Sequence, residues 1–178
     1  MKQDSPLKPV KEFRTHRRGL PHFEDPGGVY FITFRTTDGC RLSDTAKDLV
    51  ASAIDFHANH KYALYAFVVM NTHVHCILQP LEQSEGTYYS LAGILHSIKS
   101  YSANRIQKEL GWKGSVWQNE NYDRVVREDK AFEAEMNYII GNPIRDGIVD
   151  RPEDYRWLCC VGMDGLRTSR DARATEDK

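Results

Sequence analysis

The sequence predicts an α+β fold in which helices pack on one face of an antiparallel sheet. Segments rich in β-branched and aromatic residues alternate with amphipathic segments of helical period, in the order β-α-β-β-α-β-α. Two of the strand segments are joined by only Asn71 and Thr72, which favours an antiparallel hairpin. Two strand–helix–strand crossovers around such a hairpin are typical of a ferredoxin-like sandwich.

The first half of the chain contains three predicted strands and one helix. The strands are residues 29–37, 62–70 and 73–80. A helix is expected over about 44–59, because Ser43 can supply an N-cap and the apolar residues after it recur with the helical period.

The second half contains two predicted helices and a short strand region. Helices are expected over residues 91–110 and 129–141, and one or two short strands over residues 114–118 and 122–128. Ser90 can cap the first of these helices, and Gly111 can end it. The second helix is expected to stop before Pro143, because the residue before a proline disfavours the helical conformation.

Length and charge indicate one domain. A chain of 178 residues suits a single domain, which we place at residues 21–160, after a basic arm over residues 1–20 and before a disordered tail over residues 161–178. The four cysteines include no C-x-x-C pair, and no apolar stretch reaches membrane-spanning length, so a reduced, cytoplasmic location is expected. The net charge of −1 provides no global basic field, so any nucleic-acid contact must depend on local charge.

Two histidines stand two residues apart in an otherwise apolar strand. Side chains alternate along a strand, so His73 and His75 point to one face while Val74 points to the other. Their backbones are then roughly 6.5–7 Å apart, and both rings can reach one metal ion. The alternative is a pair of packed core histidines, but two buried imidazoles without partners are costly. The pair therefore predicts a metal site that needs a third ligand.

The last predicted helix can supply that ligand. With about 100° per residue, Tyr138, Asn142 and Glu135 share a flank beside the apolar stripe of the helix. A phenol and an oxygen ligand can therefore face the histidines together. An anchoring tyrosine and a helix-ending asparagine are the alternative interpretations.

Three segments together resemble the REP-associated tyrosine transposases, which are single-tyrosine members of the HUH (His–hydrophobic–His) nuclease superfamily. They are VVMNTHVHCIL, KGSVWQNENYDRVVRE and MNYIIGNPIRDGIVDRPEDYRW, and the resemblance covers roughly residues 14–157. It implies a ferredoxin-like fold of the HUH endonuclease type. It also implies that Tyr138 is the nucleophile and that His73, His75 and Asn142 bind the metal. If the Asn142 side chain points away from the histidines, Glu135 is the substitute ligand.

The same resemblance implies metal-dependent cleavage and strand transfer on single-stranded DNA near hairpins, through a 5′-phosphotyrosine intermediate. A covalent intermediate divides one difficult exchange into two easier steps. Two imidazoles and an amide oxygen suit Mg²⁺ or Mn²⁺. The expected partner is single-stranded or hairpin DNA, and the expected assembly is a monomer or a homodimer.

Basic side chains are expected to contact the DNA backbone. The candidates are Lys99, Arg105, Arg124, Arg127, Arg17 and Arg18. Two other functions remain open. One is a non-catalytic nucleic-acid-binding domain of ferredoxin-like fold, and the other is a zinc hydrolase, although no H-E-x-x-H arrangement is present.

Overall fold

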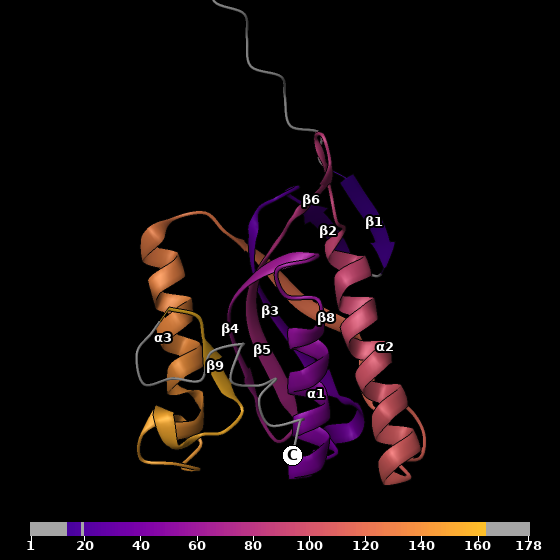
Figure 1. Cartoon of the computed structure of the whole chain (residues 1–178), viewed down its shortest axis with the longest axis vertical. Coiled ribbons are helices and arrows are strands. Elements are labelled where there is room, and N and C mark those ends of the chain that lie inside the picture. Colours follow the sequence, from indigo (N-terminus) through magenta and orange to yellow (C-terminus); the bar gives the residue numbers. More distant parts are fainter. Residues whose placement is uncertain (1–13, 19, 163–178) are drawn as a thin grey trace, which may run out of the picture.

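The computed structural model describes residues 14–18 and 20–162, and their elements are labelled in Figure 1. The strands are β1 (Arg14–Arg18), β2 (Leu20–Glu24), β3 (Val29–Thr36), β4 (Tyr62–Val69), β5 (His73–Pro80), β6 (Glu82–Ser84), β7 (Thr87–Tyr88), β8 (Trp117–Val126) and β9 (Leu158–Cys160). The helices are α1 (Asp44–Phe56), α2 (Leu91–Leu110) and α3 (Asp129–Arg145), with 3₁₀ turns at Thr37–Gly39 and Pro152–Asp154.

The main sheet has five antiparallel strands in the order β8-β3-β5-β4-β9. Its first four strands, with α1 and α2 as the crossovers, form the ferredoxin-like arrangement, so the predicted α+β class is confirmed. The strands β1 and β2 form a separate two-stranded sheet, as do β6 and β7. In the described part of the chain, no helix has both the length and the apolar character that a membrane crossing requires.

The two faces of the main sheet carry different helices. Figure 1 shows α1 and α2 side by side, with α3 apart from them across β4 and β5. The pair α1 and α2 shares one face, as expected, and we call it the helix-pair face. In contrast, α3 packs on the opposite face, where the ring of Tyr138 lies 5.1 Å from the ring of His75. We call this second face the histidine face.

Aromatic and apolar contacts close the helix-pair face. The rings of Phe34 and Trp117 meet edge to face at 4.9 Å, and the Trp117 indole donates to Ser102 Oγ of α2 at 3.0 Å. The predicted caps are present, because Ser43 Oγ accepts from the Ala46 N–H and Ser90 Oγ accepts from the Gly93 N–H. These contacts set the positions of both helices over the sheet.

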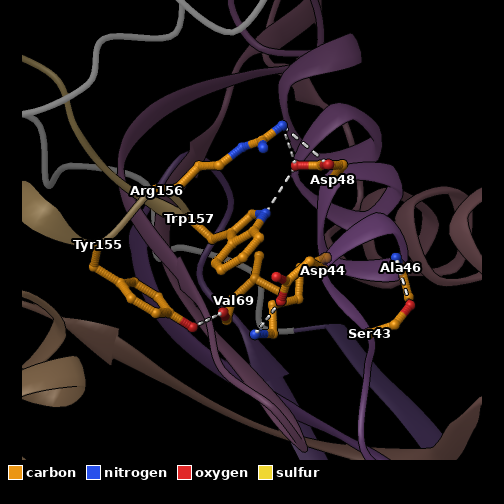
Figure 2. Close-up of polar contacts among 9 residues, drawn as sticks. Ser43, Asp44, Ala46, Asp48, Val69, Tyr155, Arg156 and Trp157 are labelled. Carbon is orange, nitrogen blue, oxygen red and sulfur yellow. Dashed lines mark hydrogen bonds and ion pairs between the residues drawn. The ribbon is translucent and has the colours of Figure 1, made fainter. Parts of the chain in front are cut away.

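The segment after α3 fastens the sheet to α1. In Figure 2, the Trp157 indole donates to Asp48 of α1 at 2.9 Å, and Arg156 pairs with the same carboxylate. The Tyr155 hydroxyl donates to the Val69 carbonyl at the end of β4 at 2.8 Å. The following strand β9 then adds to the edge of the sheet beside β4.

Several predicted boundaries differ from the structure. The predicted stop of the last helix before Pro143 is wrong, because α3 continues through this proline to Arg145. The Asp146 N–H donates to the Asn142 carbonyl at 3.0 Å, so the last turn is closed although Pro143 has no N–H to donate. One continuous strand, β8, replaces the two short ones. Part of the expected basic arm forms β1, whereas residues 1–13 and 163–178 of the arm and tail lie outside the described residues.

Candidate active site

The two histidines occupy β5, the central strand of the main sheet. Their ring centroids are 4.8 Å apart. His75 is buried, and its Nδ1 lies 2.7 Å from the Thr33 hydroxyl, which faces it from β3. Its other nitrogen, Nε2, is buried and has no hydrogen-bond partner among the described residues. In the tautomer in which Nδ1 donates to the Thr33 hydroxyl, this Nε2 carries a free electron pair inside the fold.

Both imidazoles are held in the neutral form. Burial, followed by the charges of His73, Arg35 and Arg145, lowers the pKa of His75 to about 3. Burial and Arg35 also lower the pKa of His73. Metal ions bind the neutral imidazole, so this environment favours the ligand form of both rings at neutral pH.

Tyr138 reaches the histidines from α3. Its ring lies 5.1 Å from the His75 ring and 5.8 Å from the Phe31 ring. The guanidinium of Arg145 lies over the Tyr138 ring, 4.4 Å from its centroid. The side chain is 40% exposed, so a large substrate has access to it. The structure therefore places the predicted nucleophile on the same face as the predicted metal ligands.

The two candidates for the third ligand have different neighbours. The Asn142 side chain is buried, donates from Nδ2 to the Tyr138 carbonyl at 2.8 Å, and lies near enough to His73 to oppose the lowering of the His73 pKa. Glu135 is also buried, but it forms an ion pair with Arg124. Asn142 is thus beside the histidines, whereas the Glu135 carboxylate already has a cationic partner.

The residues present fit a divalent metal ion. Among the described residues, no group of three or more His, Cys, Asp or Glu side chains could hold a metal ion. A metal ion bound by the two histidines would therefore need a further ligand of another type, and the Asn142 side chain lies beside them. The strongest support for a bound metal ion is the Nε2 of His75, which is buried and has no partner among the described residues, because a buried polar atom normally has one.

The predicted DNA contacts divide into two groups. Arg124 lies on the histidine face, with its guanidinium 5.6 Å from the Phe31 ring centroid. Lys99 and Arg105 belong to α2, which covers the other face; Lys99 donates to the Gln118 carbonyl at 2.7 Å, and Arg105 pairs with Glu109.

The other basic candidates lie at the margins of the structure. Arg127 is exposed just after β8. Arg17 and Arg18 lie in β1, and their side chains fall outside the described residues. Their role in binding DNA therefore stays a prediction.

Sequence reasoning missed four residues around the histidines. They are Phe31, Thr33 and Arg35 of β3 and Arg145 of α3. Strand alternation places the three β3 residues on one face, but only the pairing of β3 with β5 shows that it is the histidine face. Arg145 was missed because the helix was expected to end four residues earlier.

Comparisons with known proteins show what this chain is similar to in sequence and in fold. The family described as "Transposase IS200 like" matches residues 39–142. A REP-associated tyrosine transposase of Haemophilus influenzae is 21% identical over 140 residues, which span 72% of this chain and 77% of that protein. A solved structure described as the REP-associated tyrosine transposase bound to a REP hairpin has a TM-score of 0.64 and 22% identity, covering 80% of this chain and 82% of that one. A transposase structure from Deinococcus radiodurans has a TM-score of 0.46 and 18% identity, with 70% and 95% of the two chains covered.

Proposed function

The chain belongs to the IS200-like transposase family, and we propose that it cleaves and rejoins single-stranded DNA beside a hairpin with Tyr138 as the nucleophile and a divalent metal ion as cofactor. One observation carries the proposal: the exposed Tyr138 ring lies 5.1 Å from His75, whose Nε2 is buried without a partner among the described residues. The hairpin is proposed because a structure of the same fold is described as bound to one.

The reaction exchanges one phosphodiester for another. The Tyr138 hydroxyl oxygen bonds to phosphorus while the bond from phosphorus to the 3′ oxygen breaks. The phenolic proton leaves to solvent, and the departing 3′ oxygen takes up a proton. The products are a free 3′-hydroxyl and a DNA 5′ end joined to Tyr138, and a second 3′-hydroxyl reverses the step onto another strand. Phenol, with a pKa near 10, is a better leaving group than an alcohol, which makes the reversal feasible.

His73, His75 and Asn142 would hold the metal ion. An Mg²⁺ or Mn²⁺ ion bound there offsets the negative charge on the phosphate oxygens. Thr33 fixes the orientation of the His75 ring through Nδ1, and this leaves Nε2 as the nitrogen for a ligand bond. Asn142 links the site to the nucleophile, since its side chain contacts both His73 and the Tyr138 backbone.

The test is the formation of a covalent protein–DNA adduct. A labelled single strand that carries a hairpin is incubated with the protein and Mn²⁺ and then separated on a denaturing gel. We expect an adduct with the wild type and none with Tyr138→Phe, which removes only the reacting oxygen. DNA binding by Tyr138→Phe should remain within about twofold of wild type, because the ring and its packing are retained.

Tyr101→Phe is the matched control. Tyr101 is 42% exposed, close to the 40% of Tyr138, but it lies on α2 and therefore on the other side of the sheet. It should form the adduct at the wild-type rate. An adduct that persists in Tyr138→Phe would exclude Tyr138 as the nucleophile. A wild type that binds the strand but forms no adduct would indicate a binding domain without catalysis.

A further inference from the structure

Arg35 is a cation without a counter-charge beside the two histidines. It lies on β3 and pairs in register with His73, so both side chains project from the same face. Arg35 is exposed, and it has no ion pair or hydrogen bond with any described side chain. The guanidinium of Arg35 is therefore accessible to a ligand.

The surroundings of the candidate metal site are positive overall. Arg145 of α3 is a second cation there, because its guanidinium lies 4.4 Å from the centroid of the Tyr138 ring, which in turn lies 5.1 Å from the His75 ring. Asp146, whose N–H donates to the Asn142 carbonyl, brings one carboxylate close to the site. Glu135 adds nothing to this balance, because Arg124 neutralises it. Two cations thus face one carboxylate.

The donor set itself carries no charge. Two neutral imidazoles and an amide would hold the ion, whereas Mg²⁺ and Mn²⁺ sites in proteins usually include carboxylates. A dication entering this site therefore meets repulsion from Arg35 and Arg145 without any compensating charge on its ligands. An anion must therefore supply the negative charge that the three ligands lack. The phosphate of a DNA strand is such an anion.

Arginine is well suited to that anion. Its planar guanidinium can donate two parallel hydrogen bonds to a phosphate, and it stays charged at all relevant pH values. A phosphate between Arg35 and the histidines would neutralise the guanidinium and provide oxygens for the ion at the same time.

Building on the proposed function, we propose that Arg35 holds the scissile phosphate beside the histidines, and that the metal ion binds weakly until this phosphate is in place. Arg35 then has opposite effects on the two ligands: it attracts DNA and repels the metal ion. A residue with a purely structural role cannot produce this pattern, because its loss would weaken both.

The experiment uses Arg35→Gln, which removes the charge, and Arg35→Lys, which keeps it. Each is made in the full chain carrying Tyr138→Phe, so that DNA is not cleaved during titration. Free Mn²⁺ is followed by electron paramagnetic resonance without DNA. Binding of a hairpin-bearing single strand is followed by fluorescence anisotropy, with EDTA and again with Mn²⁺.

We expect Arg35→Gln to bind Mn²⁺ at least about threefold more tightly in the absence of DNA, since one repulsive charge is gone. The same variant should bind DNA in EDTA at least about threefold more weakly. Arg35→Lys should bind Mn²⁺ alone as weakly as its parent. In the parent chain, Mn²⁺ should tighten DNA binding at least about fivefold, because the coupling between two ligands is reciprocal.

Lys108→Gln is the control for charge alone. Lys108 is an exposed cation in the last turn of α2, on the opposite side of the sheet, so its loss should leave Mn²⁺ affinity unchanged. The inference about Arg35 is overturned if Arg35→Gln weakens the binding of both Mn²⁺ and DNA. It is also overturned if Arg35→Gln changes neither affinity while the chain that keeps Tyr138 still forms the adduct. A chain that binds no Mn²⁺ with or without DNA and forms no adduct would overturn the proposed function together with the inference.

Discussion

The two faces of the main sheet differ in whether their buried polar side chains have hydrogen-bond partners. On the helix-pair face, the polar Trp117 indole is buried and satisfied by Ser102. On the histidine face, His75 is equally buried but keeps one nitrogen without a partner among the described residues. The neighbouring residue Cys76 points to the helix-pair face, where burial raises its pKa to about 12. His75 and Cys76 are adjacent residues of β5 and are both buried. Burial makes the Cys76 thiol unreactive on one face and keeps the His75 imidazole neutral, and so able to bind a metal ion, on the other.

The largest effect should come from opening the core of the helix-pair face. Phe34→Ala removes a fully buried ring that packs against Trp117. We expect it to lower the free energy of unfolding by about 3–5 kcal/mol, because the cavity lies between two helices and the sheet and cannot collapse fully. Urea denaturation followed by circular dichroism measures this loss.

Phe31→Ala is the matched substitution on the histidine face. Phe31 is also buried, but its neighbours Tyr138 and Arg124 are exposed and can move into the space. Its loss of stability should therefore be smaller than that of Phe34→Ala. Equal losses at the two positions would show that the faces do not differ in rigidity.

A medium effect, of opposite sign, should come from filling the histidine face with apolar groups. The double change Thr33→Val with His75→Leu removes the hydroxyl, its imidazole partner and the partnerless Nε2 together. We expect the free energy of unfolding to rise by about 1–2 kcal/mol without metal, while adduct formation is lost. Urea denaturation in EDTA tests this prediction.

The single change His75→Leu is its control. It leaves the Thr33 hydroxyl without its partner, so it should stabilise the chain less than the double change. If the double variant had a lower free energy of unfolding than the wild type, His75 would be a residue that stabilises the core without a metal ion.

The smallest effect should arise at Tyr155, in the segment between α3 and β9. The Tyr155 hydroxyl donates to the Val69 carbonyl, and burial, then Asp44 of α1 and Asp146 after α3, raise its pKa to about 12. Tyr155→Phe should cost about 1 kcal/mol at pH 7, the usual net value of one hydrogen bond.

The pH dependence of that cost has a definite sign. In the unfolded chain Tyr155 loses its proton from about pH 10, whereas in the folded chain it keeps the proton until about pH 12. The wild type therefore loses stability as the pH rises from about 10 to about 12, and Tyr155→Phe lacks this loss. Denaturation at pH 7 and pH 11 should show a narrower gap between the two proteins at the higher pH; a constant gap would contradict the raised pKa.

Local patterns were enough to predict most of the fold. The period-two alternation in the segment from His73 placed both imidazoles on one face, and the helical period placed Tyr138 and Asn142 on one flank. The caps at Ser43 and Ser90 also follow from residue type alone, and the structure confirms them.

Contacts between segments that are distant in the sequence could not be predicted from local patterns. Thr33 and Arg35 join the site only because β3 pairs with β5 in one particular register. The ion pair that makes Glu135 the weaker candidate for a metal ligand depends on Arg124, which reaches this helix residue from strand β8. The extension of α3 past Pro143 depends on the hydrogen bond from the Asp146 N–H to the Asn142 carbonyl, which closes the last turn. The prediction that the helix stops before Pro143 considered only the steric effect of a proline on the residue before it.

The double contact of Asn142 restricts which side chain can occupy position 142. Its Nδ2 donates a hydrogen bond to the Tyr138 carbonyl, and the same side chain interacts with His73. An aspartate would be the stronger ligand for a hard cation, yet it would set a carboxylate oxygen against that carbonyl and push the turn carrying the phenol away. An amide of this length can donate to the Tyr138 carbonyl and still offer an oxygen to the proposed metal ion, so the Tyr138 backbone favours asparagine over a carboxylate at position 142.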